Sequence, residues 1–143
     1  MEQEKNNINI DTDNLPKTGL HFFDENTCYL KAKAVAFEIS KLCKHLLTKK
    51  DYTVLNPILN QLVRSSTSVY ANLAEGCVPL ISSKDRAFKF RLACKEALET
   101  ISWLQLLEEL GEISPAEAGL LTDEVIQITK ILLKSLSTMK RYQ

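Results

Sequence analysis

The sequence predicts an all-α fold, an up-down-up-down antiparallel four-helix bundle. Glycine and proline number only four each among 143 residues, and a chain so poor in turn-forming residues is not typical of an all-β protein. Apolar residues recur at steps of three and four along four long stretches, which is the spacing of an amphipathic helix. The stretches are joined by short connections, which make consecutive helices antiparallel neighbours. The length suits a single domain.

The chain begins with an acidic segment, residues 1–26, in which apolar periodicity is weak. Six carboxylates against two lysines give this segment a net charge of −4. Such termini are usually flexible unless they dock on the body of the protein, so we expect a flexible tail. The residues of the tail that could pack on the body or on a neighbouring chain are Leu20, Phe22 and Phe23.

The first two helices are placed by their apolar stripes and by one start signal. The first is predicted over residues 27–49. The second is predicted over residues 57–76, because Asn56 can act as an N-cap and Pro57 is tolerated at the first helical position.

The last two helices carry clearer signals at their ends. The third is predicted over residues 83–110, followed by Gly111 at the position where a helix C-cap belongs. The fourth is predicted over residues 115–139. Ser114 and Glu117 form the capping box of this helix, in which a hydroxyl and a carboxylate each satisfy a backbone amide.

Sequence signatures of enzyme chemistry are missing. There is no HExxH, no P-loop and no GxGxxG after a strand, and a di-iron bundle would need Glu-x-x-His pairs that the chain lacks. The two histidines are isolated. We therefore expect no enzyme activity and no cofactor. The four cysteines do not have zinc-site spacing, so we interpret them as small buried apolar residues.

The overall charge limits the class of protein further. A formal net charge of zero argues against nucleic-acid binding by the whole surface, which usually needs a strongly basic domain. No apolar run approaches the length of a transmembrane helix, and the polar N-terminus does not resemble a signal peptide. We therefore expect a cytoplasmic protein.

The second helix contains an unusual run of four hydroxyl residues at positions 65–68. Such residues are poor helix formers, so we interpret the run as a close-packed polar seam between helices or subunits, with a ligand or catalytic site as the alternative. Two carboxylates of the third helix can join the seam by meeting Arg64 or Lys95. We also expect Asn72 and Glu75 to satisfy amides near residues 77–83. The residues assigned to the seam are Arg64, Ser68, Asn72, Glu75, Glu96 and Glu99.

Two stretches of the chain resemble motifs of one known family. Residues 61–76, QLVRSSTSVYANLAEG, are similar to its QLxRSxxSIxANIAE core. Residues 91–107, RLACKEALETISWLQLL, are similar to its KLxIALKEAxETxYWLxLL helix. Their order and separation agree, and weaker similarity extends the match over residues 28–138. The chain thus resembles the bacterial four-helix-bundle proteins called 23S rRNA intervening-sequence proteins.

This resemblance implies an up-down four-helix bundle that assembles into a ring, typically a homopentamer, in a bacterial, cytoplasmic and non-enzymatic protein. A related branch, the accessory variability proteins of diversity-generating retroelements, binds nucleic acid and a reverse transcriptase. The resemblance therefore implies RNA, DNA or a reverse transcriptase as partners. The chain departs from the family pattern at Val69 and Tyr70, where Ile-Gly is usual, in the apolar loop 77–81 and in its acidic tail.

The charge is unevenly distributed along the chain. Residues 27–143 carry 16 basic and 12 acidic residues, a net charge of +4. In an up-down bundle, the starts of the first and third helices lie at the same end as the finish of the fourth. Bases early in the third helix are disfavoured by the helix dipole, so the dipole does not account for them. The predicted basic end consists of Lys31, Lys33, Lys84, Arg86, Lys89, Arg91, Lys134, Lys140 and Arg141.

Two functional hypotheses follow from this distribution. In the first, the basic end of a ring contacts RNA or DNA phosphates without reading bases, and the acidic tail competes for that end. In the second, the protein is an assembly scaffold or a reverse-transcriptase accessory factor without its own nucleic-acid affinity, and it binds another protein through the apolar loop 77–81.

Overall fold

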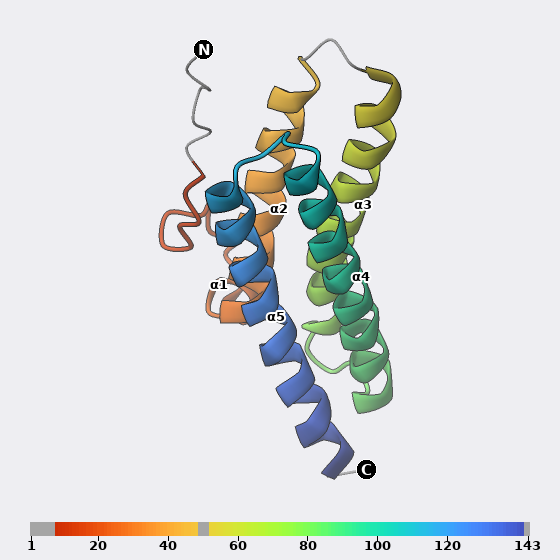
Figure 1. Ribbon diagram of the computed structural model, residues 1–143. Helices are drawn as coiled ribbons and strands as arrows, with labels where there is room; N and C mark the ends of the chain where they lie inside the picture. Colours follow the sequence, from red (N-terminus) through yellow and green to blue (C-terminus); the bar gives the residue numbers. More distant parts are fainter. Residues whose placement is uncertain (1–7, 49–51, 142–143) are drawn as a thin grey trace.

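The computed structural model describes residues 8–48 and 52–141 as a bundle of helices (Figure 1). The four long helices are α2 (Thr27–Leu46), α3 (Tyr52–Gly76), α4 (Ser83–Glu109) and α5 (Pro115–Arg141), and the short α1 (His21–Asp24) precedes them. Within the described residues there is no strand. The predicted all-α bundle is confirmed.

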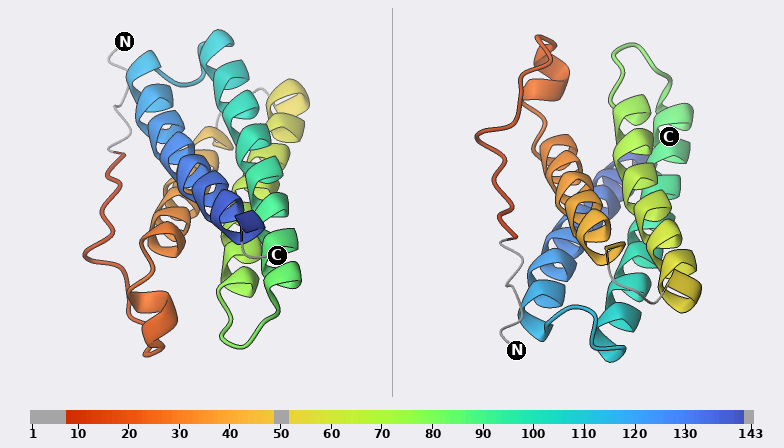
Figure 2. Two further views of the ribbon diagram at one scale, coloured as in Figure 1. Left: turned by 90° about the horizontal axis from the view of Figure 1, so that it is seen from below. Right: turned by 90° about the horizontal axis from the view of Figure 1, so that it is seen from above.

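Each long helix packs against two others: α3 against α4, α4 against α5, and α2 against both α3 and α5. Successive long helices run in opposite directions, so the starts of α2 and α4 lie near the end of α5 (Figures 1 and 2). Among the described helices, none is apolar over a sufficient length to cross a membrane. Fully buried core side chains from all four helices include Ile39, Leu46, Leu59, Leu62, Leu73, Leu104, Leu107, Leu121 and Ile128.

The turn between α4 and α5 forms as its local signals predict. Gly111 has a φ of +74°, a left-handed conformation that suits glycine. The next amide, that of Glu112, donates to the carbonyl of Leu107 at 3.0 Å and closes the end of α4. The amide of Glu117 donates to Ser114 Oγ at 3.1 Å, and the amide of Ser114 donates to Glu117 Oε2 at 3.0 Å. The predicted capping box is therefore confirmed.

The predicted start of the second helix is wrong, because α3 begins at Tyr52 and contains Pro57 in its interior. A proline in this position removes one helical hydrogen bond and crowds the preceding turn. The added turn buries Leu55, which is 5% exposed, in the core, and burial of apolar surface favours the longer helix. Asn56 is not a cap: its Oδ1 is buried and has no hydrogen-bond partner among the described residues.

The acidic segment contacts the body of the protein, although its residues 1–7 lie outside the described part. Ile8 and Ile10 pack against the core, and Lys33 Nζ donates to the carbonyl of Pro16 at 3.5 Å. The segment therefore passes beside α2 (Figure 2). These contacts dock part of residues 8–26 on the body of the protein.

A turn before α2 holds the aromatic residues of this segment in place. The carboxylate of Asp24 accepts hydrogen bonds from the amides of Thr18 at 2.9 Å and Gly19 at 3.0 Å. The Thr18 amide lowers the pKa of Asp24 below its ordinary value. The ring of Phe23 stacks on Tyr29 of α2, with centroids 4.5 Å apart. Phe23 therefore packs on the body, as the sequence suggests.

The four cysteines are free thiols. Cys28, Cys43 and Cys94 are buried, and Cys77 is half-buried. Burial raises the pKa of Cys28 and of Cys43 to about 12, which keeps both thiols neutral and unreactive. The interpretation as small buried residues is confirmed for Cys28, Cys43 and Cys94.

Candidate functional site

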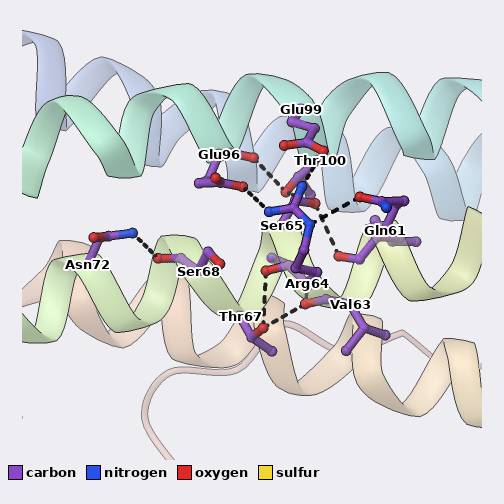
Figure 3. A network of polar contacts seen from close by, with 12 residues as sticks. Gln61, Val63, Arg64, Ser65, Thr67, Ser68, Asn72, Glu96, Glu99 and Thr100 are labelled. Atoms are coloured by element: carbon purple, nitrogen blue, oxygen red, sulfur yellow. Dashed lines mark hydrogen bonds and ion pairs between the residues drawn. The ribbon is translucent and has the colours of Figure 1, made fainter.

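The middle of the α3–α4 interface holds a network of charged and polar side chains (Figure 3). Arg64 of α3 lies between two carboxylates of α4, with Nη1 3.2 Å from Glu96 Oε2 and Nη2 in contact with Glu99 Oε1. Arg64 Nε donates to Gln61 Oε1 at 3.0 Å, and Trp103 Nε1 donates to Glu99 Oε1 at 3.2 Å. The structure thus brings Arg64, Glu96 and Glu99 together as one cluster that links the two helices.

The protonation of this cluster favours a structural role over acid–base chemistry. The hydrogen bond from Arg64 holds the pKa of Glu99 below its ordinary value, and the same bond raises the pKa of Arg64. Both groups therefore stay charged near neutral pH, whereas a general acid or base needs a pKa near the working pH. The seam interpretation is consequently better supported than the catalytic alternative.

Hydroxyl residues beneath this cluster let the two helices approach closely. Ser65 of α3 and Thr100 of α4 are completely buried, and Thr100 Oγ1 lies 2.9 Å from both Ser65 Oγ and the carbonyl oxygen of Glu96. Ser66 Oγ donates to the carbonyl of Val63 within its own helix. The buried hydroxyls are therefore satisfied, and Thr100 is a member of the seam that the sequence analysis missed.

Other predicted seam residues do not join the cluster. Asn72 Nδ2 donates to the carbonyl of Ser68 at 2.9 Å, one turn back in α3. Glu75 pairs with Lys89 of α4. Neither Asn72 nor Glu75 has a hydrogen bond to residues 77–83 within the described chain, so the predicted role of these two residues in fixing the loop is wrong.

Arg86 holds this loop instead. Its Nε donates to the carbonyl of Gly76 at 3.0 Å, and its Nη2 donates to the carbonyl of Val78 at 3.3 Å. The end of a helix leaves carbonyls rather than amides without partners, so a donor is required and a carboxylate cannot act. The loop presents Leu80, which is fully exposed and has a φ of +67°.

Three of the nine predicted basic residues link helices of the bundle or hold the loop between α3 and α4. Arg86 holds the loop described above. Lys31 of α2 contacts Glu124 Oε2 at 3.1 Å and Gln127 Oε1 at 2.9 Å on α5. Lys89 pairs with Glu75, which joins α4 to the end of α3. These residues stabilise the end of the bundle and contribute less to its outer surface.

Four of the other predicted residues lie nearer to solvent. Lys84, Arg91, Lys134 and Lys140 are exposed, and none of them forms an ion pair with a carboxylate of the described residues. Lys33 is half-buried beside the N-terminal segment, and the side chain of Arg141 lies outside the described part. We call Lys84, Arg91, Lys134 and Lys140 the basic end from here on.

The fold and the polar seam between α3 and α4 place this chain in the class of small antiparallel four-helix-bundle proteins. Within the described residues, no group of three or more His, Cys, Asp or Glu side chains could hold a metal ion. The chain belongs to the 23S rRNA-intervening sequence protein family, whose sequence model matches residues 24–134. The resemblance noted in the sequence is therefore confirmed.

A solved structure extends this similarity to the fold. The chain is similar to a protein of unknown function from the S23 ribosomal protein family of Bacteroides thetaiotaomicron, with 29% sequence identity and a TM-score of 0.70. The match covers 77% of this chain and 98% of that chain. A comparison with curated proteins finds no match.

Proposed function

We propose that this protein is a non-enzymatic, oligomeric binding protein that contacts RNA or DNA phosphates through its basic end. One observation carries the proposal: Lys84, Arg91, Lys134 and Lys140 are exposed at one end of the bundle without ion-pair partners among the described residues. When exposed lysines and arginines neutralise the phosphates of a nucleic acid, the counterions condensed on that nucleic acid are released. This release drives sequence-independent binding.

The position of two of these cations supports the proposal. Lys84 lies in the first turn of α4, where the helix dipole disfavours positive charge, and Arg91 lies two turns further on, where the dipole gives it no benefit. Helix stability therefore does not account for them. Asp85 and Asp24 reduce the local charge, and hydrogen bonds from Thr18 and Gly19 already occupy the carboxylate of Asp24. This balance fits moderate, salt-sensitive affinity.

Assembly into a ring would multiply the basic end. Large apolar side chains are exposed on two outer helix faces, with Phe37 of α2 57% exposed, Phe88 of α4 51% and Leu98 of α4 57%. Such residues favour self-association, and we propose the homopentamer that the family resemblance implies. Closed symmetry would place copies of the basic end around one axis and raise the local potential. Sedimentation equilibrium of the full chain tests the assembly, and a monomer would contradict it.

The nucleic-acid proposal is tested by filter binding of RNA and DNA over a salt series. Affinity should fall steeply with salt, with a slope that counts the phosphates bound. The double variant Lys84→Gln/Lys140→Gln should bind more weakly to every sequence and lower the slope by about 1 for each phosphate that it no longer neutralises. Lys44→Gln/Lys130→Gln is the matched control, because it removes the same charge from exposed positions outside the basic end.

Two outcomes would contradict the proposal. One is the absence of binding at low salt, or affinity that does not change with salt. The other is an equal loss of affinity in the two double variants, which would assign binding to the overall charge rather than to the basic end.

The loop 77–81 favours a second candidate function, an assembly scaffold or reverse-transcriptase accessory factor. Leu80 is completely exposed in a strained backbone conformation, and Val78 is 44% exposed. An apolar side chain held in this way suits contact with a protein. Pull-down from a lysate with and without nuclease separates the two functions. A partner that survives nuclease and is lost with Leu80→Ser supports the scaffold.

A further inference from the structure

The bundle opens at its basic end into a cleft of about 520 Å³. The cleft lies where the last turns of α5 meet the end of α3 and the start of α4, and its walls include Phe22, Arg86, Phe90, Lys134 and Thr138. A second hollow of about 320 Å³ shares Asn26, Cys77, Phe90 and Ser135 with it. The size of the main cleft falls within the range of sites for small organic ligands.

The walls of the cleft combine aromatic surface with positive charge. Phe90 is buried and Phe22 is half-buried, and the ring of Phe22 is positioned by Phe23, with centroids 4.6 Å apart. Lys134, a member of the basic end, is exposed at the rim. Among the described residues that line the two hollows, the single carboxylate is Glu25, which contacts His21 Nδ1 at 3.1 Å. The main cleft is therefore cationic and partly aromatic.

Arg86 adds a fixed charge to the wall. Its guanidinium donates to the carbonyls of Gly76 and Val78, which anchor its orientation. A guanidinium has five N–H donors, so the group keeps donors for an anion while two of them are engaged. A preorganised cation loses less entropy on binding than a free lysine does.

The hydroxyl groups of α5 offer acceptors to the same space. Ser135 Oγ donates to the carbonyl of Ile131, and Thr138 Oγ1 donates to the carbonyl of Lys134. Because each hydroxyl proton is engaged within the helix, each of these two oxygens, which line the cleft, can act only as an acceptor toward a ligand. These acceptors match the amino groups of a nucleobase. The two cations of the cleft, Arg86 and Lys134, match the phosphate of the same nucleotide.

We propose that this cleft takes an unstacked nucleotide, so that the protein prefers single-stranded nucleic acid over a duplex. The inference rests on the proposed nucleic-acid binding and adds the form of the strand. A surface that only contacts phosphates needs no cavity, whereas an unpaired base can enter a cleft and contact aromatic side chains. A base in a duplex is stacked and paired, so it cannot enter without being extruded.

The test compares a single strand of about 12 nucleotides, a typical site size, with the same strand annealed to its complement. The wild-type chain should bind the single strand about tenfold more tightly, which corresponds to the contribution of one bound base. Thr138→Trp should fill the cleft and remove this preference while the duplex affinity stays unchanged. Ser137→Trp is the matched control, because Ser137 is exposed on α5 and does not line the cleft.

The outcomes separate this inference from the function on which it rests. Equal affinity of the wild type for single strand and duplex, or an unchanged preference in Thr138→Trp, overturns the cleft while the basic end stands. Absence of all binding overturns both. As a measurement without a substitution, alkylation of Cys77, which lines the cleft, should be slowed by the single strand and not by the duplex. Equal alkylation with either also contradicts the inference.

Discussion

Arg86 in the first turn of α4 donates from Nε to the carbonyl of Gly76, the last residue of α3, at 3.0 Å. A second bond, to the carbonyl of Val78 at 3.3 Å, holds the chain as it leaves the helix. One cation therefore satisfies the end of α3, fixes the loop that presents Leu80 and supplies charge to the cleft.

Replacing Arg86 should destabilise the protein. Arg86→Ala leaves two carbonyls without a donor among the described residues, and we expect the free energy of unfolding to fall by about 1–3 kcal/mol. Urea unfolding followed by circular dichroism measures the change. Arg91→Ala is the control, because Arg91 is exposed and its loss should change stability little. Similar stability of the two variants would contradict the role of Arg86.

Gly76 and Gly119 should respond in opposite directions to alanine. A Cβ at Gly76 would lie 2.8 Å and 2.9 Å from two ring atoms of Phe90, whereas nothing lies within 4 Å of a Cβ at Gly119. Gly76→Ala should therefore destabilise by about 1–3 kcal/mol through overpacking, and Gly119→Ala should stabilise α5 by about 0.5–1 kcal/mol. The melting temperatures of both variants, compared with that of the wild type in thermal unfolding, test this prediction. Stabilisation by Gly76→Ala would show that the Phe90 ring moves aside freely.

The capping box at the start of α5 should contribute measurably to stability. Ser114→Ala removes the acceptor for the Glu117 amide, and loss of such a cap costs about 1 kcal/mol. Chemical denaturation compares this variant with Ser137→Ala, which removes an exposed hydroxyl near the other end of the same helix. If both variants lose the same stability, the cap has no specific effect.

The Arg64–Glu99 contact should make stability depend on pH in the acid range. The pKa of Glu99 in the folded chain lies below its ordinary value of 4.5. Its stabilisation is therefore complete above the unfolded pKa and is lost as the pH falls through the folded pKa. Arg64→Gln removes the cause of the shift, so the urea midpoint should change less between neutral and acidic pH.

The control for this prediction is Lys95→Gln, which removes an exposed cation one turn from Glu99 on α4. Its acid limb should match that of the wild type. Parallel curves for the wild type and Arg64→Gln would assign the acid dependence to other carboxylates.

The sequence predicted helix ends correctly where they depend on contacts between residues close together in the chain. The capping box of Ser114 and Glu117 and the glycine turn at Gly111 depend on contacts with near neighbours in sequence, so their residue types suffice. The start of α3 was predicted wrongly because it depends on the burial of Leu55 against other helices. That gain outweighs the local preference of Pro57 for a first turn.

In the candidate site, too, one contact was predicted from the sequence and another was missed. The sequence predicts that the two carboxylates of the third helix meet Arg64 or Lys95, and the contacts of Arg64 with Glu96 and Glu99 show that Arg64 is the partner. The role of Arg86 was missed, although a helix that ends before a short loop leaves carbonyls without donors. An arginine early in the next helix was the signal that could have indicated it.

The sequence by itself determined the four long helices apart from the start of α3, the family and the uneven distribution of charge, because periodicity, caps and motifs are properties of neighbouring residues. Only the tertiary structure decided which cations remain available. Lys31 forms an ion pair with Glu124 and Lys89 forms one with Glu75, whereas Lys84 and Lys134 are exposed. The cleft beside Lys134 likewise exists only where the ends of separate helices meet. Pairing and concavity depend on distances between segments far apart in the chain, which no local pattern encodes.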